Sequence, residues 1–180
     1  MTWDAHHRRG EVLRAVIDEA NARGDGALPM GLPGVDRTFA DELDLLAALQ
    51  LRWHTRLAGC IERALMEQPT DLESAVLSGW HMAARELGGV RAILDTYTAR
   101  PTSAKMGAAL ERARDKDHMM MAAMAGKASA DDPRGAHVGR RLEEQARTSW
   151  NPFPAAVPRH RAGERPTGSL IGRLRARLAA

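Results

Sequence analysis

Hydrophobic residues recur through most of the chain at steps of three and four, the spacing that gathers side chains on one face of an α-helix. Clusters of glycine and proline interrupt this pattern and predict the connections between helices. We therefore expect an all-α protein: an antiparallel up-down bundle of four main helices plus a fifth, with a disordered C-terminal tail. The five predicted helices occupy residues 3–23, 39–67, 71–98, 103–128 and 133–149.

Short polar side chains mark the predicted helix starts. Thr38 stands three residues before Asp41, a spacing in which each side chain can reach the backbone N–H of the other. Thr70 and Glu73 have the same spacing at the start of the third predicted helix. The connections that follow the second and third helices are short, so consecutive helices should run antiparallel.

Composition divides the chain into a predicted helical bundle over residues 1–149 and a proline- and arginine-rich linker with a docking segment over 150–180. The second part contains six arginines against Glu164, a net charge of +5, which leaves −2 for the rest of a chain whose total is +3. A body without excess positive charge lacks the electrostatic signature of a nucleic-acid binder. The basic tail, in contrast, leaves nucleic acid open as a partner.

Cysteine use and hydropathy bear on the compartment. Cys60 is the only cysteine, so an internal disulfide is excluded and a reducing compartment is favoured. The charged N-terminus lacks the apolar core of a signal peptide, and no apolar run approaches the ~20 residues of a spanning helix. We therefore expect a cytoplasmic protein with no transmembrane segment, in which Cys60 is an inert buried thiol.

Histidines on different predicted helices form the main candidate site. In an antiparallel hairpin, residues at one level have numbers with a constant sum, and this register brings His54, His81 and His118 to nearly one level. The first helix would add His7. Imidazoles that converge inside a bundle can bind iron, zinc or haem, although the Glu-x-x-His pattern of di-iron bundles does not occur here. The alternative is that these histidines lie at helix borders and hydrogen-bond to neighbouring helices.

Asp117 falls on the inward face of the fourth predicted helix. A carboxylate at such a position needs a partner, for which Arg56, Arg85 or a histidine are the candidates, and structural pairing is favoured over catalysis. The sequence contains no P-loop, no nucleophile elbow, no GxGxxG and no zinc-type pairs of cysteines, so no enzyme class is indicated.

The chain becomes apolar again at its end. Residues 168–175 read Gly-Ser-Leu-Ile-Gly-Arg-Leu-Arg, which resembles the C-terminal cargo-loading peptides of encapsulin systems. Such peptides dock on the inner wall of a protein shell. Arg173 stands where serine is usual, and the two halves of the peptide are closer together than usual. The resemblance implies a protein partner that is contacted through Leu170, Ile171, Leu174 and Arg175.

These observations favour a cytoplasmic helical-bundle protein, without enzymatic activity, that acts by protein–protein interaction and uses its tail as a docking arm. The alternative is a metal- or haem-binding bundle, similar to ferritin and hemerythrin in architecture only, that is carried as shell cargo. Without the cargo resemblance, the end of the tail is a short amphipathic basic helix for an acidic partner, anionic lipid or nucleic acid. The sequence leaves a homo-oligomer open.

Overall fold

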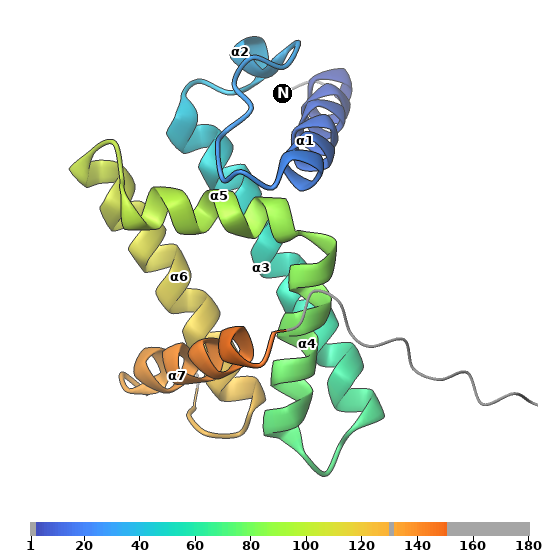
Figure 1. Ribbon diagram of the computed structural model, residues 1–180, viewed down its shortest axis with the longest axis vertical. Coiled ribbons are helices and arrows are strands. Elements are labelled where there is room, and N and C mark those ends of the chain that lie inside the picture. The colour runs from blue at the N-terminus through green and yellow to red at the C-terminus, as the bar shows by residue number, and fades with distance from the viewer. Residues whose placement is uncertain (1–2, 130–131, 151–180) are drawn as a thin grey trace, which may run out of the picture. The chain divides into compact units, whose positions relative to one another are not determined.

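The computed structural model describes residues 3–129 and 132–150, and all regular secondary structure in these two ranges is helical, which confirms the predicted all-α class. No helix in this part of the chain is both long and apolar enough to cross a membrane. The helices are α1 (Trp3–Arg23), α2 (Val35–Thr38), α3 (Glu42–Glu67), α4 (Leu72–Glu86), α5 (Gly88–Ala99), α6 (Ala104–Met124) and α7 (Gly135–Thr148) (Figure 1).

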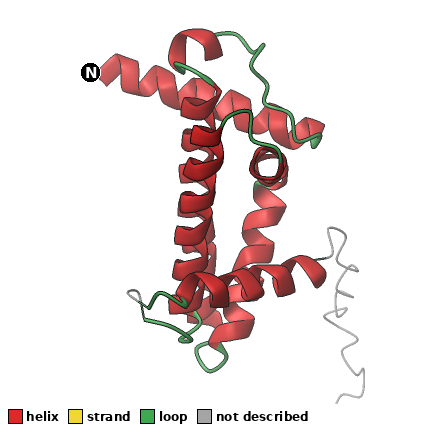
Figure 2. Cartoon of the chain, turned by 90° about the vertical axis from the view of Figure 1, so that its left-hand side faces the viewer, coloured by secondary structure: helices red, strands yellow, loops and turns green. Residues whose placement is uncertain are grey.

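The arrangement of the helices follows from short turns and buried faces. α3 and α4 form an antiparallel hairpin, α6 packs against α3, and α5 and α7 contact both the hairpin and α6 (Figure 1). Figure 2, turned by 90°, shows α5 nearly end-on, so this helix runs across the bundle rather than along it. α1 packs against α5, and α2 lies beside α1. The bundle therefore combines long helices that run side by side with helices that cross them.

The third predicted helix, over 71–98, is wrong in one respect, because the structure divides it into α4 and α5. Leu87 at the junction has φ −124° and ψ 35°, outside the helical region. The side chain of Asn21 on α1 stabilises the break. Its amide donates to the carbonyl oxygen of Glu86 at 3.0 Å, and its oxygen accepts from the N–H of Gly89 at 2.9 Å. One side chain of another helix thus satisfies two backbone groups that the break exposes.

Two predicted helix starts are also corrected. Asp41, and not Thr38, is the N-cap of α3, and its side chain accepts a hydrogen bond from the backbone N–H three residues ahead at 2.8 Å. Asp71 takes the same role at α4 in place of Thr70. Aspartate is at least as good an N-cap as threonine, and in both cases it directly precedes the first helical turn.

The core is one apolar cluster that includes three tryptophan rings. Trp53 and Trp80 are 1% and 3% exposed, and their rings meet edge to face with centroids 6.2 Å apart. Trp150 contacts Trp80 in the same way, with ring centroids 6.1 Å apart. The last residue of the compact unit Met1–Trp150 therefore packs against the core. Cys60 is buried, as predicted, and burial raises the pKa of its thiol.

Candidate functional site

Polar side chains enter this apolar interior where α3, α5, α6 and α7 face one another. A buried polar group is costly unless it is hydrogen-bonded, so each such side chain must have a partner. The buried polar residues among those described are Gln50, Arg91, Asp117, His118 and Glu143.

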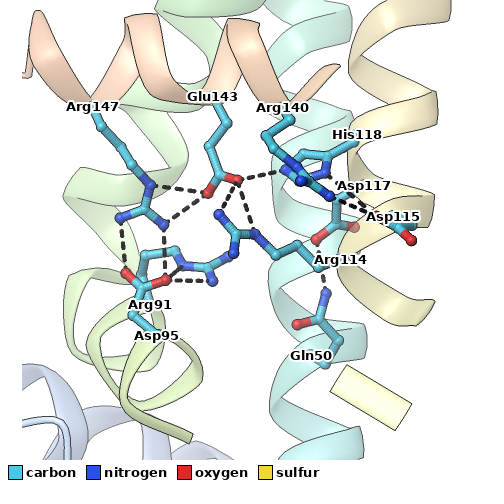
Figure 3. A network of polar contacts seen from close by, with 10 residues as sticks. All are labelled: Gln50, Arg91, Asp95, Arg114, Asp115, Asp117, His118, Arg140, Glu143 and Arg147. Carbon is cyan, nitrogen blue, oxygen red and sulfur yellow. Dashed lines mark hydrogen bonds and ion pairs between the residues drawn. The ribbon is translucent and has the colours of Figure 1, made fainter. Parts of the chain in front are cut away.

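An ion network links α5, α6 and α7 (Figure 3). Arg147 donates to Glu143, one turn earlier on α7, at 2.7 Å and to Asp95 on α5 at 2.8 Å. Arg91 also donates to Asp95, at 2.7 Å. From α6, Arg114 reaches Glu143 at 3.3 Å. The network therefore fixes how these three helices cross.

The two carboxylates of this network are ionised at neutral pH. Burial by itself opposes the ionisation of Glu143, but the hydrogen bond from His118 and the charges of Arg91 and Arg147 outweigh it, and the pKa of Glu143 lies well below its ordinary value. Burial likewise opposes the ionisation of Asp95, and the same two arginines lower its pKa. Opposite charges are thus paired within a largely buried cluster, which is the condition under which buried charges are tolerated.

His118 connects α6 to α7. Its side chain is 1% exposed, and its Nε2–H donates to the carboxylate of Glu143 at 2.7 Å. Its other nitrogen, Nδ1, makes no hydrogen bond to any described residue, and Asp115 lies 3.9 Å away. His118 is therefore a structural group that a ligand from solvent does not reach.

A second polar group lies nearer the surface, between α3 and α6. Asp117 accepts a hydrogen bond from the amide of Gln50 at 2.8 Å and one from Nδ1–H of His54 at 2.6 Å. Burial raises the pKa of Asp117 above its ordinary value, while these two hydrogen bonds oppose the rise. Because Asp117 holds the proton of His54 on Nδ1, the ring nitrogen left for other contacts is Nε2.

This group lines a pocket of about 360 Å³ between α3 and α6. The lining residues recur on each helix at steps of three, four or one, which places them on a single face of that helix. Its apolar walls are formed by Leu43, Ala47, Leu51, Ala109, Leu110 and Ala113. Its polar residues are Gln50, His54, Lys116 and Asp117. Apolar walls with a few polar groups are typical of small-molecule sites.

The hypothesis of border histidines is confirmed for three of the four candidates. His81 on α4 donates through Nε2 to the backbone carbonyl of Ala146 on α7 at 2.8 Å. His54 bonds to α6 and His118 to α7, as described above. The register argument predicted that His54 on α3 lies level with His118 on α6. The structure agrees, because His54 bonds to the neighbouring residue Asp117, although this group is a carboxylate and not a second imidazole.

The structure does not assemble the four histidines into a metal site. His7 is exposed on α1, 3.8 Å from Glu11. Within residues 3–129 and 132–150, no group of three or more histidine, cysteine, aspartate and glutamate side chains is placed to hold a metal ion. The metal and haem hypothesis therefore has no ligand set in this part of the chain.

The partner of Asp117 was predicted only as one of three candidates, namely Arg56, Arg85 or a histidine. The histidine is confirmed, in the form of His54. The two arginines are engaged elsewhere, since Arg56 pairs with Glu86 and the guanidinium of Arg85 lies 5.8 Å from the centre of the Trp150 ring.

Sequence reasoning missed most of the polar interior. Gln50 did carry a signal, because it is a polar residue within the otherwise apolar stripe of the second predicted helix. The spacing of Glu143 and Arg147 is that of a surface ion pair, so it does not indicate burial. Lys116 and Arg91 carry no local signal. The predicted docking residues Leu170, Ile171, Leu174 and Arg175 lie outside the described residues.

No family model matches the chain, and no curated protein and no solved structure is significantly similar to it.

Proposed function

We propose that this is a cytoplasmic binding protein that takes up a small, mainly apolar molecule between α3 and α6. The observation that carries the proposal is the pocket of about 360 Å³, with six apolar side chains and the Asp117–His54 pair in its lining. Pockets of this size and character are usual for small ligands. The ion network behind the pocket supports the proposal, because it fixes α6 and so keeps one wall of the pocket in place.

Binding is favoured over catalysis by the residue types in the lining. A histidine oriented by a carboxylate can act as a general base. However, the ten lining residues include no hydroxyl or thiol group that this base could activate as a nucleophile. The proposal therefore assigns His54 the role of a polar contact for the ligand.

A neutral apolar dye tests this proposal. We expect 1-naphthylamine to bind the full chain saturably, with a rise in fluorescence. Ala113→Phe should weaken binding by at least ~10-fold, because the new ring occupies the pocket. The matched control is Ala108→Phe, on the same helix but exposed and outside the lining, which should change the affinity by less than ~2-fold. Equal effects of the two substitutions would show that the dye binds elsewhere.

We propose as a second function that the tail docks the protein onto a protein partner. The supporting observation is in the sequence, where the apolar residues of segment 168–175 follow a stretch rich in proline and arginine. An apolar segment that follows a proline- and arginine-rich linker is suited to binding a partner surface. The resemblance to cargo-loading peptides makes the inner wall of an encapsulin shell the first partner to test.

Co-expression with an encapsulin shell protein tests the docking arm. The full chain should co-purify with assembled shells. Replacing Leu170, Ile171 and Leu174 together by serine should abolish loading, although the tail keeps its net charge of +5. Replacing the six arginines by glutamine should matter less, and mainly at low salt. If loading survives the serine changes and is lost with the arginines, the tail is electrostatic, and nucleic acid or anionic lipid becomes the better partner.

A further inference from the structure

The lining of the α3–α6 pocket holds one positive charge with no partner in the described part of the chain. Lys116 lies on α6 next to Asp117, it is exposed, and it makes no hydrogen bond or ion pair to any residue that the structure describes. The charged side chains around Glu143, in contrast, are paired with one another. An unpaired cation beside apolar walls is therefore available to a ligand.

The second available atom is Nε2 of His54. Nδ1 of the same ring is hydrogen-bonded to Asp117, and no described residue makes a hydrogen bond or ion pair with Nε2. The ring nitrogen can accept a hydrogen bond when the ring is neutral and can donate one when it is protonated. His54 is about 40% exposed, so this nitrogen can be reached by a molecule in the pocket.

The carboxylate of Asp117 is not available in the same way. One of its oxygens accepts from Gln50 and the other from His54, and the residue is 4% exposed. The buried negative charge in the pocket lining, that of Asp117, is therefore already hydrogen-bonded on both oxygens and would be a poor partner for a cationic ligand. The polar groups that remain for a ligand are thus Lys116 and Nε2 of His54. When the ring is protonated, both donate hydrogen bonds, and such a pair of donors favours an anion.

We infer that the ligand of this pocket is a monocarboxylic acid with an apolar body, held at its carboxylate by Lys116 and by the Nε2–H of protonated His54, and along its chain by the apolar walls. This inference rests on the proposed binding function of the pocket. At about 30 Å³ for each water-sized group, a pocket of about 360 Å³ accommodates roughly ten to twelve non-hydrogen atoms. A medium-chain fatty acid has this size.

The charge of the lining selects a monoanion over a dianion. Lys116 contributes one positive charge and a protonated His54 a second, while Asp117, bound directly to that ring, contributes a negative one. The sum is at most one positive charge, which a carboxylate neutralises. A dianionic phosphate ester would bring a second negative charge close to the carboxylate of Asp117, where like charges repel strongly at low dielectric constant.

Three probes of equal chain length test the inference by calorimetry on the full chain: octanoate, 1-octanol and octylammonium. Octanoate should bind with 1:1 stoichiometry and at least ~10-fold more tightly than 1-octanol, and octylammonium should bind most weakly. In a nitrogen-detected or long-range ¹H–¹⁵N spectrum, octanoate should shift the Nε2 resonance of His54. The Nε2 resonance of His81 should not shift, because that nitrogen is hydrogen-bonded to the carbonyl oxygen of Ala146.

A pair of lysine variants provides the matched control. Lys116→Met should reduce the affinity for octanoate by about 5–10-fold and leave that for 1-octanol unchanged. Lys105→Met removes the same charge from an exposed position of the same helix outside the lining, and it should change octanoate binding by less than ~2-fold. Unfolding curves of both variants check that neither has lost its fold.

The outcomes separate the two proposals. If octanoate and 1-octanol bind equally well and Lys116→Met has no effect, the carboxylate assignment is wrong and the apolar pocket function stands. Tighter binding of octylammonium would overturn the inference as well, and would assign recognition to Asp117. If none of the three probes binds saturably, both the inference and the proposed pocket function are rejected.

Discussion

Replacing Gly139 by alanine is expected to lower the free energy of unfolding by more than ~3 kcal/mol, or to prevent folding. Gly139 lies on α7 where this helix crosses α6. A Cβ atom at this position would lie 1.8 Å from the carbonyl oxygen of His118 and 2.5 Å from its Cα. These are backbone atoms, so no side-chain rotation relieves the clash and the two helices must move apart. Urea-induced unfolding followed by circular dichroism measures the effect.

The control for this prediction is a second glycine in a helix. Gly59 on α3 has no atom within 4 Å of the position that a Cβ would take. Gly59→Ala should therefore stabilise the protein by ~0.5–1 kcal/mol, since alanine loses less conformational entropy in a helix. A similar effect of both substitutions would contradict the close crossing of α6 and α7.

Neutralising Glu143 is the second change with a large expected effect. Glu143→Gln should lower the free energy of unfolding by about 3–5 kcal/mol at pH 7. The glutamine keeps the shape of the side chain but removes the negative charge that His118, Arg114 and Arg147 share. These three donors would then remain beside a side chain that is only 3% exposed and no longer carries a negative charge. Glu144→Gln, at the next and exposed position, should stay within ~0.5 kcal/mol of the unsubstituted protein.

The pH dependence of this effect has a definite sign. The folded-state pKa of Glu143 is lowered, so the unfolded chain binds more protons in acid, and the carboxylate stabilises the fold above the ordinary glutamate pKa of about 4.3. That contribution is lost as the pH falls further. The difference between the unsubstituted protein and Glu143→Gln should therefore be largest near pH 7 and shrink below about pH 4.3. A difference that grows in acid would mean that Glu143 is not the anionic partner of this network.

The difference between two proteins is the quantity to measure, because Asp117 acts in the opposite direction. Burial raises its folded-state pKa, so the contribution of Asp117 to the free energy of unfolding falls as the pH rises through that pKa. Both proteins in the comparison contain Asp117, and its contribution cancels to first order. Unfolding curves at a series of pH values between 7 and about 2 are sufficient for this test.

The helical class and most helix positions could be predicted from the sequence, because their causes are local. α1 occupies the predicted range 3–23, and α3 ends at the predicted Glu67. Apolar spacing and glycine or proline breaks act within a few residues of the chain, so they are visible without knowledge of the fold. The choice of Asp41 over Thr38 as a helix cap shows the limit of such signals, because two capping residues three positions apart compete for one helix start.

The break between α4 and α5 needed the tertiary structure. The apolar spacing continues through Leu87, and a pair of glycines is compatible with a helix that packs closely. What ends α4 is the approach of α1: Asn21 hydrogen-bonds the backbone on both sides of the break, and a Cβ on Gly89 would lie 2.0 Å from the carbonyl oxygen of Ala20. Residues more than sixty positions apart in the sequence make this contact.

The sequence by itself determined that the body is helical and that Asp117 faces inward and needs a partner. Only the tertiary structure decided that this partner is His54 and that His81 and His118 hydrogen-bond to α7 and not to each other. The physical reason is that periodicity reports which face of a helix is buried, and not which helix covers it. Buried charges such as Glu143 depend on that second fact, since each is tolerated only where another helix brings the opposite charge.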